Sequence, residues 1–305
     1  MATISSYQKI VLMGLGKSGK STIKSIAFEG KSPADCQGYN ATLNYERSTK
    51  RTLDLPYQIF DLGGQENFLT SFIGDQAEFI FSDVVCFVWV VDVSNFERVS
   101  NSKYYWDQAL KKLAEYSPKA EVFCLFHKMD LIRQPMRADL IESMVDYFDT
   151  PNIFQGKTHI HGTSIYDESL FVSLGQIMQT ILLKNSKTAL VATSIDEFLA
   201  GNQEISGVAV FTIEDGLPVF ENGKFTEKVY LPANLWLANY ERLSENPVFS
   251  IKKTFKSTLE MDDCTIVFQK LRNDLLICTI TIKPTPLQYM SIKMDEISLI
   301  VSELV

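Results

Sequence analysis

The sequence lacks the features that mark several large classes of protein. It has five cysteines and no CxxC pair, so their spacing supports neither a zinc site nor a disulfide framework. No apolar run reaches the length of a membrane-spanning helix, and the longest, Val84–Val91, is only as long as a strand. We therefore expect a cytoplasmic protein in a reducing compartment, without direct membrane insertion.

A basic surface is also missing. The 29 Lys and Arg residues are outnumbered by 37 Asp and Glu, which gives a formal net charge of −8. Proteins that bind nucleic acid need an excess of positive charge to contact the phosphates, so nucleic acid is not expected as a partner. An apolar fraction of 46% over 305 residues is typical of a soluble chain long enough for two globular domains.

The pattern of strand-like and helix-like segments changes along the chain. At first, apolar runs such as Val84–Val91 and Glu121–Phe126 alternate with helical segments, and a strand is predicted over Thr52–Phe60. This order predicts a doubly wound, mostly parallel α/β sheet. Later, a hairpin signal at Asp215–Pro218 and further strand-like runs between helices predict a smaller α+β domain with an antiparallel sheet. We place the domains at 1–185 and 194–305, with a linker at 186–193.

A glycine-rich loop between the first predicted strand and the first predicted helix is the strongest motif. Gly14 to Ser21 reads GLGKSGKS and matches the P-loop pattern G-x4-G-K-[ST]. In this pattern backbone N–H groups surround the phosphates, Lys20 reaches the β- and γ-phosphates, and the Ser21 hydroxyl ligates Mg²⁺. The nucleotide-binding residues predicted here are Gly14, Gly16, Lys17, Ser18, Gly19, Lys20, Ser21 and Thr22.

The segment after the Thr52–Phe60 run helps to separate the classes of P-loop protein. Asp61 falls at the carboxyl end of a predicted strand, where it can hold Mg²⁺ through a water molecule. The Gly64 amide can donate to the γ-phosphate, and Gln65 can orient the attacking water. A water-positioning glutamine favours hydrolysis of the nucleotide over transfer of its phosphate to a small molecule.

A threonine between these two motifs is needed to reach Mg²⁺ and the γ-phosphate. Thr42 is the predicted residue, with Thr49 and Thr52 as alternatives. No arginine lies between Ser21 and Thr42, so this stretch is not expected to supply an arginine finger. We therefore expect slow intrinsic hydrolysis that an activating protein accelerates.

The base is predicted to be read after the next apolar run, where the chain reads HKMD. Asp130 can accept both hydrogen bonds from the N1–H and N2–H₂ edge of guanine, which adenine cannot supply. The Lys128 stem is expected along the base. His127 either ties the loop to this strand or is a satisfied strand-end residue. A backbone N–H at Ser164 or Ile165 can meet guanine O6.

Taken in order, the motifs GLGKSGKS, DLGGQE, HKMD and TSIYDE resemble the Rag/Gtr branch of Ras-like GTPases, over the first ~185 residues. The later order of elements resembles the roadblock domain of that family. The resemblance implies GTP/GDP and Mg²⁺ as ligands, and a homodimer or a heterodimer with a related Rag-like GTPase formed through the C-terminal domain. It also implies activating and exchange proteins, a roadblock-type scaffold, recruitment by partners to a lysosome- or vacuole-like surface, and TOR-type nutrient signalling.

Two other functions remain open at this point. One is a scaffold subunit that binds nucleotide and never cycles, and the other is a P-loop kinase acting on a small metabolite. Gln65, Thr42 and Gly64 favour the switch, because a frozen subunit needs no water-positioning group. Lys20, Gln65 and Thr42 are accordingly the predicted catalytic residues, and Ser21, Thr42 and Asp61 the predicted metal ligands.

Overall fold

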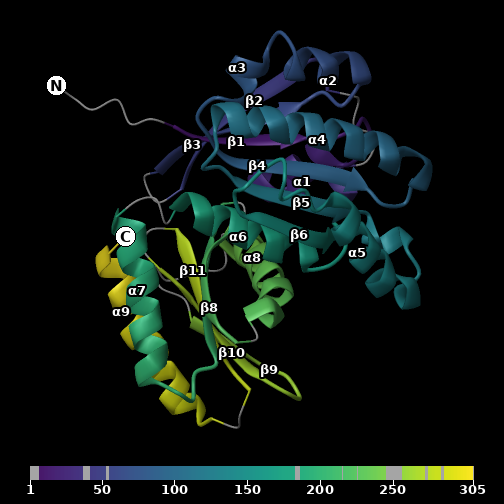
Figure 1. Ribbon diagram of the computed structural model, residues 1–305. Helices are drawn as coiled ribbons and strands as arrows, with labels where there is room; N and C mark the ends of the chain where they lie inside the picture. Colours follow the sequence, from purple (N-terminus) through teal and green to yellow (C-terminus); the bar gives the residue numbers. More distant parts are fainter. Residues whose placement is uncertain are drawn as a thin grey trace, which may run out of the picture. The chain divides into compact units, whose positions relative to one another are not determined.

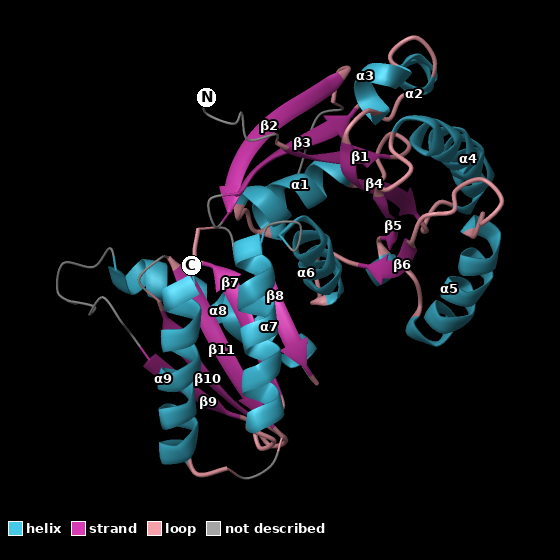
Figure 2. Ribbon diagram, turned by 60° about the vertical axis from the view of Figure 1, so that its left-hand side comes forward, coloured by secondary structure: helices cyan, strands magenta, loops and turns pink. Residues whose placement is uncertain are grey.

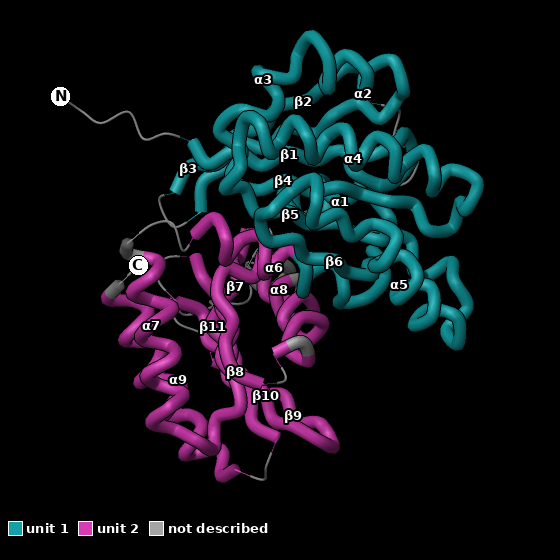
Figure 3. Tube along the Cα trace, viewed as in Figure 1, with its two compact units in different colours: residues 1–173 teal, residues 174–305 magenta. Residues whose placement is uncertain are grey.

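The computed structural model of the chain separates into two compact units, Met1–Ser173 and Leu174–Val305 (Figure 3). It describes residues 7–36, 42–52, 55–182, 186–214, 216–224, 226–244, 256–271, 274–282 and 285–304. Each unit is built on its own sheet. None of the helices described there is both long enough and apolar enough to cross a bilayer.

The first unit holds a six-stranded sheet with helices on both faces (Figure 1). Its strands are β1 Gln8–Met13, β2 Tyr45–Thr52, β3 Leu55–Leu62, β4 Val84–Asp92, β5 Glu121–His127 and β6 Thr158–Thr163. Its helices are α1 Lys20–Glu29, α2 Glu66–Ile73, α3 Ala77–Phe81, α4 Val99–Tyr116 and α5 Gln134–Phe148. Helix α6, Ser169–Leu182, begins in this unit and ends in the second. The short 3₁₀ turns are η1 Pro33–Cys36, η2 Phe96–Arg98 and η3 Met129–Leu131. The strand order is β2-β3-β1-β4-β5-β6, with only β2 antiparallel to its neighbour, so the predicted doubly wound sheet is confirmed.

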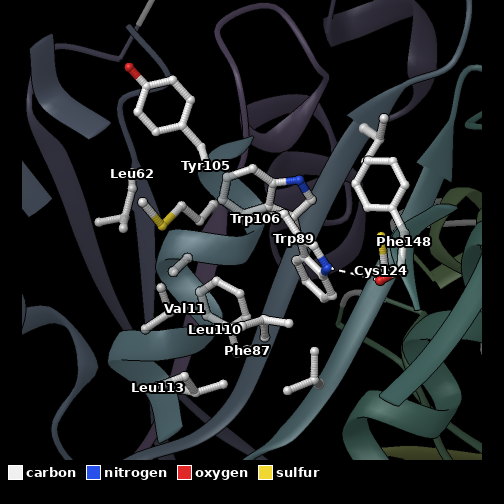
Figure 4. Packing of buried hydrophobic residues seen from close by; sticks show 14 of the residues in the cluster. Val11, Leu62, Phe87, Trp89, Tyr105, Trp106, Leu110, Leu113, Cys124 and Phe148 are labelled. Atoms are coloured by element: carbon white, nitrogen blue, oxygen red, sulfur yellow. Dashed lines mark hydrogen bonds between the residues drawn. The ribbon is translucent and has the colours of Figure 1, made fainter. Parts of the chain in front are cut away.

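The central strands are apolar on both sides because helices cover both faces of the sheet. On one face Trp106 of α4 packs against Trp89 of β4 and Phe148 of α5, and its indole N–H donates to the Phe148 carbonyl at 3.0 Å (Figure 4). On the other face Phe28 of α1 packs on Tyr57 of β3, with ring centroids 6.2 Å apart. This packing fixes the carboxyl ends of the parallel strands side by side, so the loops that follow them converge at one edge of the sheet.

The strand predicted over Thr52–Phe60 is wrong at its start. Thr52 is the last residue of β2, and β3 begins at Leu55. β2 is an edge strand of the sheet and only its last residue, Thr52, is buried, so it needs no apolar alternation that a sequence pattern would reveal. Because β2 pairs with β3, the residues just before β2 lie beside the carboxyl end of β3. There the Gly63 N–H donates to the Asn44 carbonyl at 2.6 Å.

The second unit holds an antiparallel sheet of five strands in the order β8-β7-β11-β10-β9, which confirms the predicted second sheet. Its elements are α7 Ser186–Gly201, β7 Gly207–Thr212, β8 Pro218–Gly223, η4 Thr226–Val229, α8 Tyr230–Ser244, β9 Lys256–Glu260, β10 Thr265–Lys270, β11 Leu275–Thr281 and α9 Leu287–Leu304. The segment 186–193, expected as a linker, forms the first half of α7.

The helices of this unit cover both faces of its sheet. Trp236 of α8 stacks on Phe268 of β10, whereas Met290 of α9 contacts Thr281, which pairs with Thr265. Phe268 and Thr265 are an odd number of residues apart on β10, so their side chains point to opposite faces. Helix α7 lies beside α9 on the second of these faces (Figure 2).

Candidate nucleotide site

The predicted phosphate loop lies between β1, which ends at Met13, and α1, which begins at Lys20. Gly19 precedes α1 with φ +106°, and a Cβ atom there would lie 2.6 Å from the His127 ring. Both the backbone and the close contact therefore require glycine at this position. No side chain caps the helix, so the N–H groups of its first turn have no acceptor within the helix and are available to an anion.

Lys20 is buried beneath the loop with only 5% of its surface exposed. Its ammonium group donates to the carbonyl oxygens of Gly14 and Leu15, at 2.9 Å each. Burial lowers the pKa of Lys20 to about 8; the nearby Asp61 carboxylate opposes this shift, and Arg98 adds to it. Backbone carbonyls thus take the place of phosphate oxygens around a cation that the fold has removed from water.

The three predicted metal ligands come together beside the loop. The Ser21 and Thr42 hydroxyl oxygens are 2.9 Å apart, which is about the spacing of neighbouring ligands around an octahedral Mg²⁺. Both carboxylate oxygens of Asp61 are buried, and no group in the described part of the chain gives them a hydrogen bond of good geometry. Burial raises the pKa of Asp61, although Ser21 and Lys20 counter the shift. A buried carboxylate beside two hydroxyls fits a hard divalent cation such as Mg²⁺.

The turn that carries Gln65 packs directly on the loop. The Gly16 N–H donates to the Gly64 carbonyl at 2.6 Å, and a Cβ atom on Gly64 would collide with the Gly16 nitrogen. Only glycine allows this approach. Gln65 follows at the start of α2, with its side chain exposed.

A cavity of about 560 Å³ joins these groups, within the usual size range of ligand pockets. Most of its lining had been predicted from the sequence. The lining residues are Gly16, Lys17, Gly19, Lys20, Ser21, Thr22, Cys36, Thr42, Leu62, Gly64, Gln65, Glu66, Arg98 and Lys128.

His127 lies under the loop rather than at its rim. Its ring is buried against Gly19, and its Nδ1 shares a hydrogen bond with the Thr163 hydroxyl at 3.0 Å. Burial, with a contribution from the Lys128 charge, lowers the pKa of His127 to about 4, so the ring is neutral at neutral pH. The ring therefore contacts the loop by packing, while its hydrogen bond goes to β6.

Lys128 and Asp130 occupy the turn after β5. The Lys128 ammonium donates to the Lys17 carbonyl at 2.8 Å and to the Asp92 carboxylate at 2.5 Å, which ties the loop to the ends of β4 and β5. One Asp130 carboxylate oxygen accepts from the Ser164 hydroxyl at 2.7 Å. The Ser164 N–H donates to the Ser169 hydroxyl, so it already has an acceptor, and Ile165 is the next residue along the turn.

Arg98 is a charged residue at this site that the sequence did not predict. It ends η2, after β4, and its Nη1 donates to the Gly16 carbonyl at 2.8 Å. The expected position for such an arginine was between Ser21 and Thr42, where the chain has none. Because β4 lies next to β1 in the sheet, an arginine in the turn after β4 was the available signal.

Comparison with known proteins identifies the family. The model of the Gtr1/RagA G protein conserved region matches residues 9–245. GTP-binding protein GTR1 of Saccharomyces cerevisiae is 34% identical over 178 residues, covering 57% of this chain and 57% of that protein. Ras-related GTP-binding protein A of Dictyostelium discoideum is 31% identical over 176 residues, covering 57% of this chain and 58% of that protein.

The matched region spans a little more than half the length of these relatives. Among solved structures, the Arl6 BBS3 small GTPase from Trypanosoma brucei with bound nucleotide analogue GppNp aligns with a TM-score of 0.45 and 20% identity, covering 58% of this chain and 98% of that one. Since the family model matches most of the sequence, from residue 9 to residue 245, this chain belongs to the Gtr1/RagA family of G proteins.

Proposed function

We propose that this protein is a switch that binds GTP with Mg²⁺ and slowly hydrolyses it to GDP. The observation that carries the proposal is the cavity in which the buried ammonium of Lys20, the paired hydroxyls of Ser21 and Thr42, and Gln65 border one space. A structural nucleotide site would need the phosphate loop, but it would not need a glutamine at the same cavity.

The loop and its neighbours bind the phosphates. The N–H groups at the start of α1 and the Lys20 ammonium contact the β- and γ-phosphates, and the Gly64 amide donates to the γ-phosphate. Ser21, Thr42 and Asp61 would hold Mg²⁺, and the bound ion would neutralise charge on the phosphate oxygens. An approaching γ-phosphate gives Lys20 an anionic partner in place of two neutral carbonyls.

Gln65 orients the water that attacks the γ-phosphorus. The water oxygen bonds to this phosphorus as its bond to the β–γ bridging oxygen breaks, and that electron pair stays on GDP. One hydrogen of the water remains on the new phosphate hydroxyl, and the other proton passes to another oxygen of the released phosphate. The protein forms no covalent bond in this reaction, so its contribution is positioning and charge.

Asp130 supplies the choice of guanine. Its carboxylate accepts from N1–H and N2–H₂, while the hydrogen bond from Ser164 fixes its orientation. The Ile165 N–H meets guanine O6, and the Lys128 stem lies along the base with its ammonium held on Lys17. His127 supports the loop from below through Gly19. Hydrogen-bonded groups preorganised in this way discriminate strongly against a base that leaves them unpaired.

The other parts of the proposal rest on family membership. The relatives are named GTP-binding protein and Ras-related GTP-binding protein. We infer a dimer with a second copy or with a related G protein through the second unit. We also infer activating and exchange proteins, a roadblock-type scaffold, recruitment from the cytoplasm to an endomembrane surface, and a role in TOR-type nutrient signalling.

Two substitutions test the switch. Lys20→Ala removes the buried cation, so the affinity for GTP and GDP falls by about a hundredfold or more. Gln65→Leu keeps GTP affinity within about threefold and slows hydrolysis at least about tenfold. Nucleotide affinity and single-turnover phosphate release are measured on the same preparations.

The competing functions give different results. Tight GTP binding with no phosphate release above the buffer rate, with or without activating proteins, would identify a scaffold that does not cycle. Equal affinity for ATP and GTP would contradict the role of Asp130 and favour a kinase. Hydrolysis by Gln65→Leu at the parental rate would remove Gln65 from the mechanism.

A further inference from the structure

Arg98 lies at the phosphate loop, where its hydrogen-bond acceptor is a neutral group that does not require a positive charge. Its Nη1 donates to the neutral carbonyl of Gly16, and its side chain lines the same cavity as Lys20 and Gln65. In the part of the chain that the structure describes, no carboxylate forms an ion pair with it. A guanidinium has five N–H donors in one plane, and the described structure engages one of them at this loop.

Two cations therefore border one cavity. Lys20 is buried and also donates to neutral carbonyls, and the positive charge of Arg98 makes its ammonium harder to protonate. Like charges placed close together in a partly dehydrated site repel each other. An anion bound between them attracts both cations and outweighs this repulsion, so the pair fits a phosphate group of high charge.

The position of Arg98 along the loop indicates which phosphate it faces. Arg98 holds the carbonyl of Gly16, and Lys128 holds the next carbonyl, that of Lys17. Lys128 belongs to the side of the site that carries Asp130, whereas Gly16 also donates its N–H to the Gly64 carbonyl, one residue before Gln65. Arg98 is thus on the side of the cavity that carries Gln65, the residue proposed to orient the attacking water.

We propose that Arg98 is an internal arginine for the γ-phosphate, which contacts a γ-phosphate oxygen of bound GTP and stabilises the charge of the phosphoryl group as it is transferred. The inference rests on the proposed GTPase function and deepens it. Arg98 contributes electrostatic stabilisation only, and the bonds that form and break are those of hydrolysis by water.

The size of the effect follows from G proteins with and without an internal arginine. Their intrinsic rates are on the order of 10⁻² s⁻¹ and 10⁻⁴ s⁻¹ to 10⁻³ s⁻¹, respectively. Single-turnover hydrolysis by Arg98→Ala is therefore expected to fall about thirtyfold below that of the parent protein. GDP affinity should stay within about threefold, because GDP has no γ-phosphate. Arg98→Lys keeps the charge but loses the planar fork, and its rate should lie between the two.

Two further measurements separate this role from support of the loop. Added guanidinium ion should restore part of the hydrolysis rate of Arg98→Ala and leave that of the parent protein unchanged. Aluminium fluoride, which mimics the transferring phosphoryl group, should bind with GDP to the parent protein in the absence of any activating protein and bind measurably less to Arg98→Ala. The matched control is Arg47→Ala, which removes an exposed arginine from β2, outside the cavity.

The outcomes distinguish the two levels of the proposal. If the parent protein binds and hydrolyses GTP while Arg98→Ala does so at the same rate, the role of Arg98 is wrong and the switch stands. If Arg98→Ala loses GDP and GTP affinity equally and guanidinium gives no rescue, Arg98 only supports the loop. If the parent protein itself fails to bind GTP, the proposed function has failed before Arg98 is tested.

Discussion

His127 is a neutral histidine held in a buried place, and that makes it a source of acid sensitivity. Its folded-state pKa of about 4 lies below the ordinary value of 6.5, because burial disfavours the charged ring. The unfolded chain therefore binds a proton in the interval between these values when the folded chain does not. The stability that depends on the neutral ring is fully present above the ordinary pKa and is lost as the pH falls towards the folded value.

We predict that His127→Asn removes this dependence. Between about pH 7.5 and about pH 5 the parent protein should lose roughly 2 kcal/mol more unfolding free energy than the variant. Urea denaturation of both proteins at the two pH values gives the difference, and every other titrating group cancels in the comparison. If the difference in unfolding free energy between parent and variant is the same at both pH values, the His127 ring titrates normally in the folded protein.

At the scale of single elements, the turn between β3 and α2 packs directly against the phosphate loop. Gly64 allows this turn to touch Gly16, while the loop itself is held by β1, α1 and the bond from Lys128 to Lys17. A methyl group at Gly64 should therefore displace the turn and leave the loop in place. Gln65 would move with the turn, away from the attacking water.

We predict that Gly64→Ala slows single-turnover GTP hydrolysis at least about tenfold and changes GDP affinity by less than about threefold. The control is Gly201→Ala at the end of α7, where an added methyl group meets nothing within 4 Å. Filter binding of labelled GDP and phosphate release report the two effects separately. Equal losses of GDP affinity and of rate would mean that the loop has moved instead of the turn.

Most elements of the first unit could be predicted because their apolar patterns arise from burial on the sheet. β2 could not, since a polar edge strand such as one carrying Glu46 and Arg47 shows no such pattern. The same limit applies to the site. Gly14 to Ser21 is one contiguous loop with a recognisable spacing, whereas the Arg98 contact joins residues from different loops through the adjacency of β1 and β4.

At the scale of the whole molecule, the second unit exposes large apolar side chains on both of its helical layers. Ile292 and Leu299, seven residues apart on α9, are 57% and 61% exposed, and Leu231 and Leu235 of α8 are exposed to a similar extent. Contiguous exposed apolar surface marks an interaction site more often than isolated residues do. Because α8 and α9 cover opposite faces of the sheet, substitutions on each helix can show which of the two surfaces binds a partner.

We predict a dimer through the second unit in which the α9 surface is covered by a second copy or by a related G protein. Replacing both Ile292 and Leu299 with lysine should weaken the dimer by about a hundredfold or more, because two buried apolar side chains contribute about 3 kcal/mol or more. The matched pair, Leu231→Lys with Leu235→Lys, should leave the dimer intact.

Light scattering at micromolar concentration gives the mass of the protein, both alone and mixed with a related G protein. A monomer in both samples would contradict the dimer, whereas loss of the dimer only with the α8 pair would place the interface on the opposite face. The candidate nucleotide site lies wholly in the first unit, so GDP affinity should be unchanged in both variants. Dimer formation and nucleotide binding can therefore be tested independently.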